Sequence, residues 1–168
     1  MGRMYRMEPI IVLSHFHRKM GPVVFYSFPE RMLDAEQSCR IAKMLDEMEH
    51  KGPFARSLEE FQAINYNFEI QPDPERISKE LFLISLLFEE QVTPEVEREI
   101  AGLLRAFTER MKAERELYNV FYLDDLTALS AHEKKSAAQL NLLIKSWARE
   151  LQVQVLTEFF QEAANPSL

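Results

Sequence analysis

The chain has 168 residues, of which 46% are hydrophobic, and a formal net charge of −7 at pH 7. A chain of this size forms one domain with a core that needs no disulfides, and its acidity argues against nonspecific nucleic-acid binding, which requires clustered cations. The lone Cys39 excludes an internal disulfide and a cysteine-based metal site, which favours a cytoplasmic location, and no apolar run reaches the roughly 18 residues of a membrane span.

The first predicted elements are two strands that fold back on each other within residues 9–30. The unbroken run of branched residues at 10–13 is typical of a strand covered on both faces. Gly21-Pro22 interrupts the pattern, and residues 23–28 are again β-branched and aromatic. A hairpin is therefore predicted, preceded by an N-terminal arm of residues 1–8 with no assigned structure.

The connection of this hairpin, roughly residues 17–21, carries the candidate interaction surface, which consists of Arg18, Lys19 and Met20. Charged residues at a tip favour exposure to solvent, and an exposed loop held by a rigid sheet is well placed to contact a partner.

An amphipathic helix is predicted at about residues 33–49, with Asp34 placed to cap its N-terminus. Its apolar residues follow the i, i+3, i+4, i+7 spacing of one helical face. They are Ile41, Met44, Leu45 and Met48. Lys51-Gly52-Pro53 is expected to end this helix with a stop signal and a turn.

The next segment, residues 54–71, is ambiguous, because residues 57–61 could begin a helix. Residues 63–70 alternate with a period of two, which predicts a strand with Ile64, Tyr66, Phe68 and Ile70 on one face. A loop with two prolines follows at 72–74, and the apolar run at 81–88 predicts a buried strand. A further strand between residues 54 and 70 is left open.

The C-terminal half is predicted to be helical. Thr93-Pro94-Glu95 is a strong helix start, and apolar residues then recur at helical spacing up to Met111. The segment 114–130 is expected to continue as helix with a bend or break near Asp124-Asp125. A long helix is predicted at about 131–164, with an apolar stripe that must be buried on the domain or on a second copy. The stripe consists of Leu140, Leu143, Ile144, Trp147, Leu151 and Val155.

This order of elements predicts an α+β fold, with an antiparallel sheet and helices layered on its faces. The order along the chain is strand, strand, helix, two or three strands, and then helices.

His15 and His17 form the strongest candidate for a chemical site. In an extended strand their rings point to the same side, as metal binding requires. The sequence shows no third ligand at a helpful spacing, so polar residues at a strand end are the alternative. A metal-binding domain or small enzyme that uses these histidines remains the second hypothesis.

Other polar residues are weaker candidates. Ser14 lacks the glycine-flanked elbow of a nucleophilic serine, and Cys39 is expected to be a small packed residue of a helix. His50 and His132 are expected at a helix end and in a loop. The acidic residues at loops and helix ends are typical of an acidic protein. They are Asp73, Glu75, Asp124 and Asp125. No phosphate-binding motif occurs, and neither a cofactor nor a metal is expected.

Two segments resemble the longin domain of archaeal longin-type proteins and of nitrogen-permease-regulator-like and folliculin-like proteins. The first has the pattern F-x-x-x-x-G-P, then a strand, then a proline. It consists of Phe16, Gly21-Pro22, residues 23–28 and Pro29-Glu30. The second consists of residues 65–70 followed by 80–89. The resemblance covers residues 9–113. The chain differs from a minimal longin in two respects: it has a helical extension at 114–168, and its predicted strands number one fewer than the usual five.

The resemblance implies a non-enzymatic module that dimerises with itself, or with a longin or roadblock partner, and that binds a small Ras-like GTPase. Such modules act as parts of exchange factors, parts of activators, or adaptors of vesicle trafficking. Peripheral association with a membrane is compatible with this role. No catalytic residue carries over. Arg18 is the one position where an arginine finger would be tested, and a solvated turn cation is its alternative. A third hypothesis is a ligand-sensing domain with an apolar pocket between the sheet and the helices.

Overall fold

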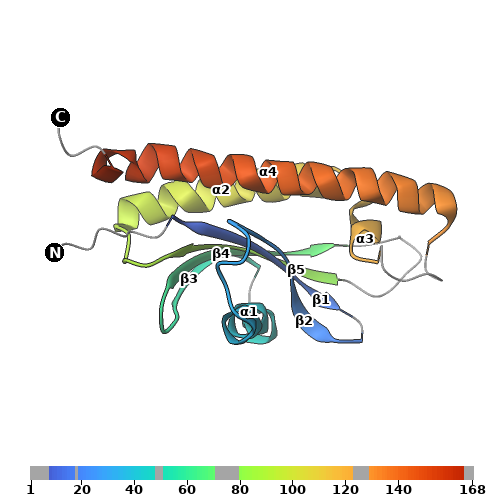
Figure 1. Ribbon diagram of the computed structural model, residues 1–168, viewed down its shortest axis with the longest axis horizontal. Helices are drawn as coiled ribbons and strands as arrows, with labels where there is room; N and C mark the ends of the chain where they lie inside the picture. The colour runs from blue at the N-terminus through green and yellow to red at the C-terminus, as the bar shows by residue number, and fades with distance from the viewer. Residues whose placement is uncertain (1–7, 18, 48–50, 71–79, 123–128, 165–168) are drawn as a thin grey trace.

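The computed structural model describes residues 8–17, 19–47, 51–70, 80–122 and 129–164 of the chain (Figure 1). The strands are β1 (Ile10–His17), β2 (Gly21–Phe28), β3 (Gly52–Ser57), β4 (Gln62–Ile70) and β5 (Glu80–Phe88). The helices are α1 (Ala35–Ala42), the 3₁₀ helix η1 (Lys43–Glu47), α2 (Pro94–Lys112), α3 (Leu117–Val120) and α4 (Ala131–Ala164). The predicted α+β class is confirmed.

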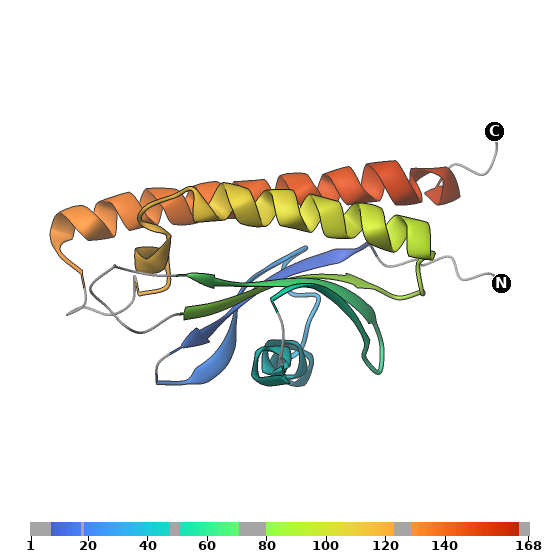
Figure 2. The ribbon, with the colours of Figure 1, turned by 180° about the vertical axis from the view of Figure 1, so that it is seen from behind.

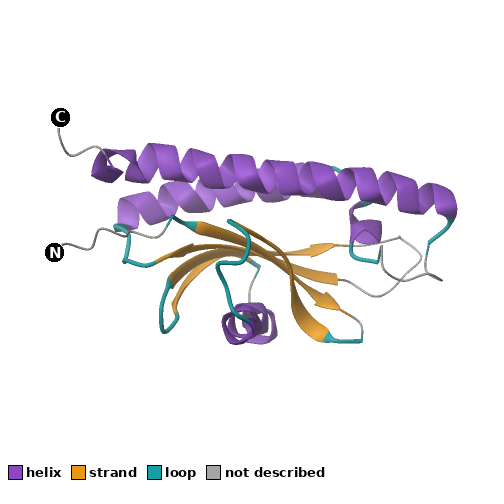
Figure 3. Ribbon diagram, viewed as in Figure 1, coloured by secondary structure: helices purple, strands orange, loops and turns teal. Residues whose placement is uncertain are grey.

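The five strands form one antiparallel sheet in the order β2-β1-β5-β4-β3. The helices lie in two layers, with α2, α3 and α4 over one face of the sheet and α1 with η1 under the other (Figure 3). α2 and α4 run side by side in opposite directions, with α2 nearer the viewer when the molecule is seen from behind (Figure 2). Both β2 and β3 are edge strands.

The N-terminal hairpin is confirmed. β1 pairs with β2 from Ile11 opposite Phe28 to His17 opposite Gly21, with a bulge after Leu13. β1 is also hydrogen-bonded to β5, so it is an inner strand covered on both faces. This position explains why the run at 10–13 has no polar residue, since each of its side chains is fully buried.

The expectation that Gly52-Pro53 ends a helix with a turn is wrong, because these residues open strand β3. Proline cannot donate a hydrogen bond to a neighbouring strand and is tolerated at a sheet edge, which is where β3 lies. Asn67 on β4 fixes the start of this strand, since its Oδ1 accepts a hydrogen bond of 2.5 Å from the amide of Gly52. β3 is thus the further strand that the sequence left open.

The predicted helix after the hairpin is shorter than expected. The prediction extended this helix to residue 49, but α1 ends at Ala42 and is followed by the 3₁₀ helix η1. Residues 48–50, which include Met48 and His50, lie outside the described part of the chain. Asp34 caps α1 as predicted and forms a capping box with Gln37. Its Oδ1 accepts from the Gln37 amide at 2.7 Å, while the Gln37 side chain accepts from the Asp34 amide at 2.9 Å.

We expect Asp34→Ala to lower the free energy of unfolding by about 0.5–2 kcal/mol, because the first turn of α1 loses its side-chain acceptor. Chemical denaturation of the two proteins measures the difference. Asp34→Asn keeps an acceptor oxygen and is the matched control, with an expected loss of less than half of that value. Equal losses for the two substitutions would contradict the role of the cap.

Two hydrophobic cores hold the layers together. The larger lies between the sheet and α2, α3 and α4, and includes Ile11, Ile64, Leu104 and Ile144. The smaller lies between the sheet and α1–η1, and includes Ile10 and Leu87 with the α1–η1 residues Ile41, Met44 and Leu45. The residues of β1 alternate between the two cores, as the period of a strand requires.

The predicted start of α2 is confirmed, with Thr93 as N-cap and Pro94 in the first turn. The Thr93 Oγ1 accepts a hydrogen bond of 3.3 Å from the Val96 amide. The helix predicted at 114–130 is wrong in most of its described part, where only the short α3 is helical. The bend proposed at Asp124-Asp125 lies outside the described residues, as does the loop proposed at 72–74.

The bounds of α4 agree with the prediction, and five of the six residues of its stripe are buried. Leu143 is the exception, with 44% of its surface exposed. α4 packs on β1 and β2 and alongside α2 and α3, so its stripe is buried within this chain. No helix in the described ranges is long and apolar enough to cross a bilayer.

Candidate functional site at the hairpin end

The tip of the β1–β2 hairpin exposes apolar side chains next to a cation. Met20 is 64% exposed and Phe16 is 37% exposed, and Lys19 lies between them in sequence and is also exposed. Arg18, the third residue of the candidate surface, lies outside the described residues. A contiguous exposed apolar patch marks a contact site in many proteins, and Phe16 and Met20 both lie at this end of the hairpin.

His17 shapes this tip. Its Nδ1 accepts hydrogen bonds from the backbone amides of Lys19 at 3.1 Å and Met20 at 3.2 Å. The imidazole therefore holds the turn that presents Met20, which is a structural role that the sequence analysis did not anticipate.

His15 and His17 lie on the same side of β1, as predicted, with their ring centroids 5.9 Å apart. His15 is buried and stacks on Phe121 just after α3, at a centroid distance of 4.6 Å. Phe121 also contacts Phe25 of β2 and Phe82 of β5. The two histidines thus belong to an aromatic cluster that attaches the α3 region to the hairpin end of the sheet.

A buried acid completes this cluster and was missed by the sequence analysis. Glu80 is 6% exposed, and its Oε1 accepts a hydrogen bond of 2.8 Å from the hydroxyl of Tyr122, whose ring lies 6.0 Å from that of His17. Burial, and then the hydrogen bond to Glu80, raises the pKa of Tyr122 well above its usual value, so the phenol stays a donor. The β1–β5 ladder ends at His15 opposite Phe82. Glu80 and His17 each lie two residues beyond that pair, and only strand pairing reveals their proximity.

These residues do not form a metal centre in the described structure. Across the described ranges, no group of three His, Cys, Asp or Glu side chains is arranged to hold a metal ion. Ser14 points to the opposite face of β1 from His15, because adjacent strand residues alternate. Cys39 is exposed on α1, which corrects the expectation that it is packed.

Several weaker candidates are not brought to this site. His132 is exposed near the start of α4, in a helix and not in the predicted loop. Asp73, Glu75, Asp124 and Asp125 lie outside the described residues.

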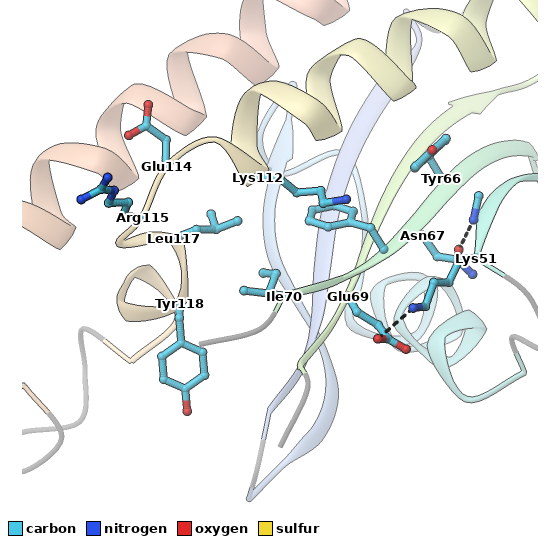
Figure 4. Close-up of a pocket in the computed structure, with 12 residues that line it drawn as sticks. Lys51, Tyr66, Asn67, Glu69, Ile70, Lys112, Glu114, Arg115, Leu117 and Tyr118 are labelled. Atoms are coloured by element: carbon cyan, nitrogen blue, oxygen red, sulfur yellow. Dashed lines mark hydrogen bonds and ion pairs between the residues drawn. The ribbon is translucent and has the colours of Figure 1, made fainter. Parts of the chain in front are cut away.

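A separate hollow of about 570 Å³ lies where the end of α2 meets β4 (Figure 4). Phe68, Ile70 and Leu117 contribute its apolar surface. Its charged lining consists of Lys51, Glu69, Lys112, Glu114 and Arg115. Lys51 is already paired with Glu69 at 2.9 Å, and Figure 4 shows that Glu114 and Arg115 point away from the apolar residues. The volume of the hollow is in the range of small-molecule sites. Small-molecule sites are mostly apolar, however, whereas half of the residues that line this hollow are charged or polar.

The fold and the site define an α+β protein with an antiparallel sheet between two helical layers and an exposed apolar hairpin tip. The sequence matches no protein-family model and no curated protein sequence.

Proposed function

We propose that the chain is a longin-like, non-enzymatic interaction module of the cytoplasm. In this proposal it binds a small Ras-like GTPase through the tip of the β1–β2 hairpin and associates with a second copy or with a longin or roadblock protein. The observation that carries the proposal is the exposure of Phe16, Lys19 and Met20 at the tip of the paired β1–β2 hairpin.

The arrangement of the sheet supports the longin-like assignment. The strand that the sequence count lacked is β3, so the described sheet has the five strands expected of a longin. The longin order along the chain is two strands, a helix, further strands and then C-terminal helices, and the described elements follow the same order.

The placement of the polar candidates supports a role in binding. Both imidazoles are engaged in the architecture of the hairpin end, one by stacking on Phe121 and the other by accepting backbone hydrogen bonds. Ser14 lies on the other face of the sheet, and Cys39 lies on α1. A nucleophile and its base must be within hydrogen-bonding reach of each other, and these residues do not form such a pair.

We expect the purified chain to bind at least one small Ras-like GTPase of its source organism, loaded with GDP or with a non-hydrolysable GTP analogue. Met20→Asp should weaken that binding at least about tenfold, because a carboxylate replaces an apolar contact. Biolayer interferometry measures the dissociation constants.

Met32→Asp is the matched control. Met32 is also an exposed methionine, at 42%, but it follows the end of β2 that is farther from the hairpin tip. Its affinity should equal that of the unchanged chain. The proposal fails if no GTPase binds in either nucleotide state, or if the two substitutions weaken binding equally.

A further inference from the structure

The face of the sheet that α1 and η1 cover carries three buried oxygen atoms without a partner among the described residues. We propose that Ser14, Asn65 and Ser85 together bind an ordered water molecule between the sheet and η1. The inference uses no residue of the hairpin tip and does not depend on the proposed function.

The pairing of three inner strands brings these residues together. Ser85 of β5 lies opposite Asn65 of β4 on one side and opposite Val12 of β1 on the other. Ser14 is two residues beyond Val12, so it lies on the same face of the sheet and diagonal to Ser85. This is the face under η1, because Val12 belongs to the smaller core and the Asn65 Nδ2 lies 3.8 Å from the Met44 Sδ.

The three side chains are completely buried, each with 0% exposure. Within the described ranges, the Ser14 Oγ, the Ser85 Oγ and the Asn65 Oδ1 accept or donate no hydrogen bond. The side chains of the smaller core around them are apolar and offer no donor. A buried polar atom without a partner costs free energy, and native proteins satisfy nearly all such atoms with protein groups or with ordered water.

The polar row is a property of one face of the sheet. The residues that alternate with it on the same three strands are Leu13, Ile64 and Ile84, which belong to the larger core on the opposite face. That face is covered by α2, α3 and α4 and is apolar at this level of the sheet. The oxygens are therefore concentrated where the thinner α1–η1 layer covers the strands (Figure 3).

One water molecule matches the hydrogen-bonding needs of this set. A buried water makes about three hydrogen bonds. The Asn65 Oδ1 can only accept, whereas a serine hydroxyl can donate, so the water donates to Asn65 and accepts from both hydroxyls. Opposite residues of paired strands have Cβ atoms about 5 Å apart, which is close to the ~5.6 Å between two oxygens that each lie ~2.8 Å from a bridging water. The oxygens are neutral, whereas protein sites for Ca²⁺ and Mg²⁺ are built with carboxylates.

Ser85→Ala removes one of the three partners and tests the site in the full chain. Magnetic relaxation dispersion of water ¹⁷O measures how many water molecules reside inside the protein, and its amplitude should fall by the contribution of one molecule. The midpoint of urea denaturation should fall as well, because the Asn65 Oδ1 loses its donor when the water leaves. If no water is bound, the midpoint should instead rise, since the substitution removes an unpaired buried hydroxyl.

Thr108→Val is the matched control. Thr108 is the one buried polar residue of α2, and its Oγ1 also lacks a partner in the described part of the chain. A single hydroxyl does not supply the roughly two to four partners that a buried water needs. The dispersion amplitude should therefore be unchanged, and the urea midpoint should stay equal or rise.

Three results overturn the proposal. The first is a dispersion amplitude that Ser85→Ala leaves unchanged, and the second is an equal fall in amplitude for Ser85→Ala and Thr108→Val. The third is a urea midpoint of Ser85→Ala that equals or exceeds that of the unchanged chain.

Discussion

Replacing Ile144 with alanine should lower the free energy of unfolding by about 2–5 kcal/mol, because it leaves a cavity in the core between α4 and the sheet. Ile144 is fully buried, in the centre of the inner face of α4. The measurement is urea denaturation followed by circular dichroism. The size of the loss reports whether α4 is part of the cooperative unit.

Leu143 is the matched control, since it is the next residue and is 44% exposed. Leu143→Ala should cost less than about 1 kcal/mol, because its side chain keeps much of its contact with solvent in the folded state. If Leu143→Ala costs as much as Ile144→Ala, then α4 presents a different face to the sheet from the one described here.

Tyr122→Phe should lower the free energy of unfolding at pH 7 by about 1–3 kcal/mol, because it removes a hydrogen-bond donor from the buried carboxylate of Glu80. The ring itself stays, so packing against Tyr118 and His17 is preserved. Chemical denaturation at pH 7 measures the loss. Tyr66→Phe removes a hydroxyl from a half-buried tyrosine of strand β4 and should cost less than half as much.

The same substitution should change the response to alkaline pH. The pKa of Tyr122 is about 10 in the unfolded chain and is raised in the folded chain. At a pH between these two values, the folded state keeps the phenol proton and the unfolded state loses it. This contribution to stability is complete below about pH 10 and falls by about 1.4 kcal/mol per pH unit above it. The difference in stability between the unchanged chain and Tyr122→Phe should therefore shrink above pH 10. A constant difference would contradict the buried Tyr122–Glu80 pair.

Much of the local structure could be predicted from the sequence, because it depends on contacts within a few residues. The Asp34 cap, the Thr93-Pro94 start of α2 and the burial of β1 follow from side-chain chemistry at fixed spacing. The same-side placement of His15 and His17 follows from the alternation of a strand.

The errors arise where a local signal has two meanings. Gly52-Pro53 can end a helix or begin an edge strand, and pairing with β4 decides between the two. Leu143 lies at the border of the α4 stripe, where helical spacing alone allows either burial or exposure. The contact between α4 and the sheet is too narrow to cover Leu143, which remains exposed.

The sequence by itself determined the class of fold, the order of most elements and the amphipathic faces, since periodicity and capping act over one or two turns. Only the tertiary structure decided what surrounds the histidines. Phe121 stacks on His15, and Tyr122, which is hydrogen-bonded to Glu80, lies beside His17; these contacts span more than 60 residues of chain and depend on sheet pairing and the packing of α3. It also decided which stripe of α4 is buried and which remains outside, because that depends on the surface that the sheet presents to the helix.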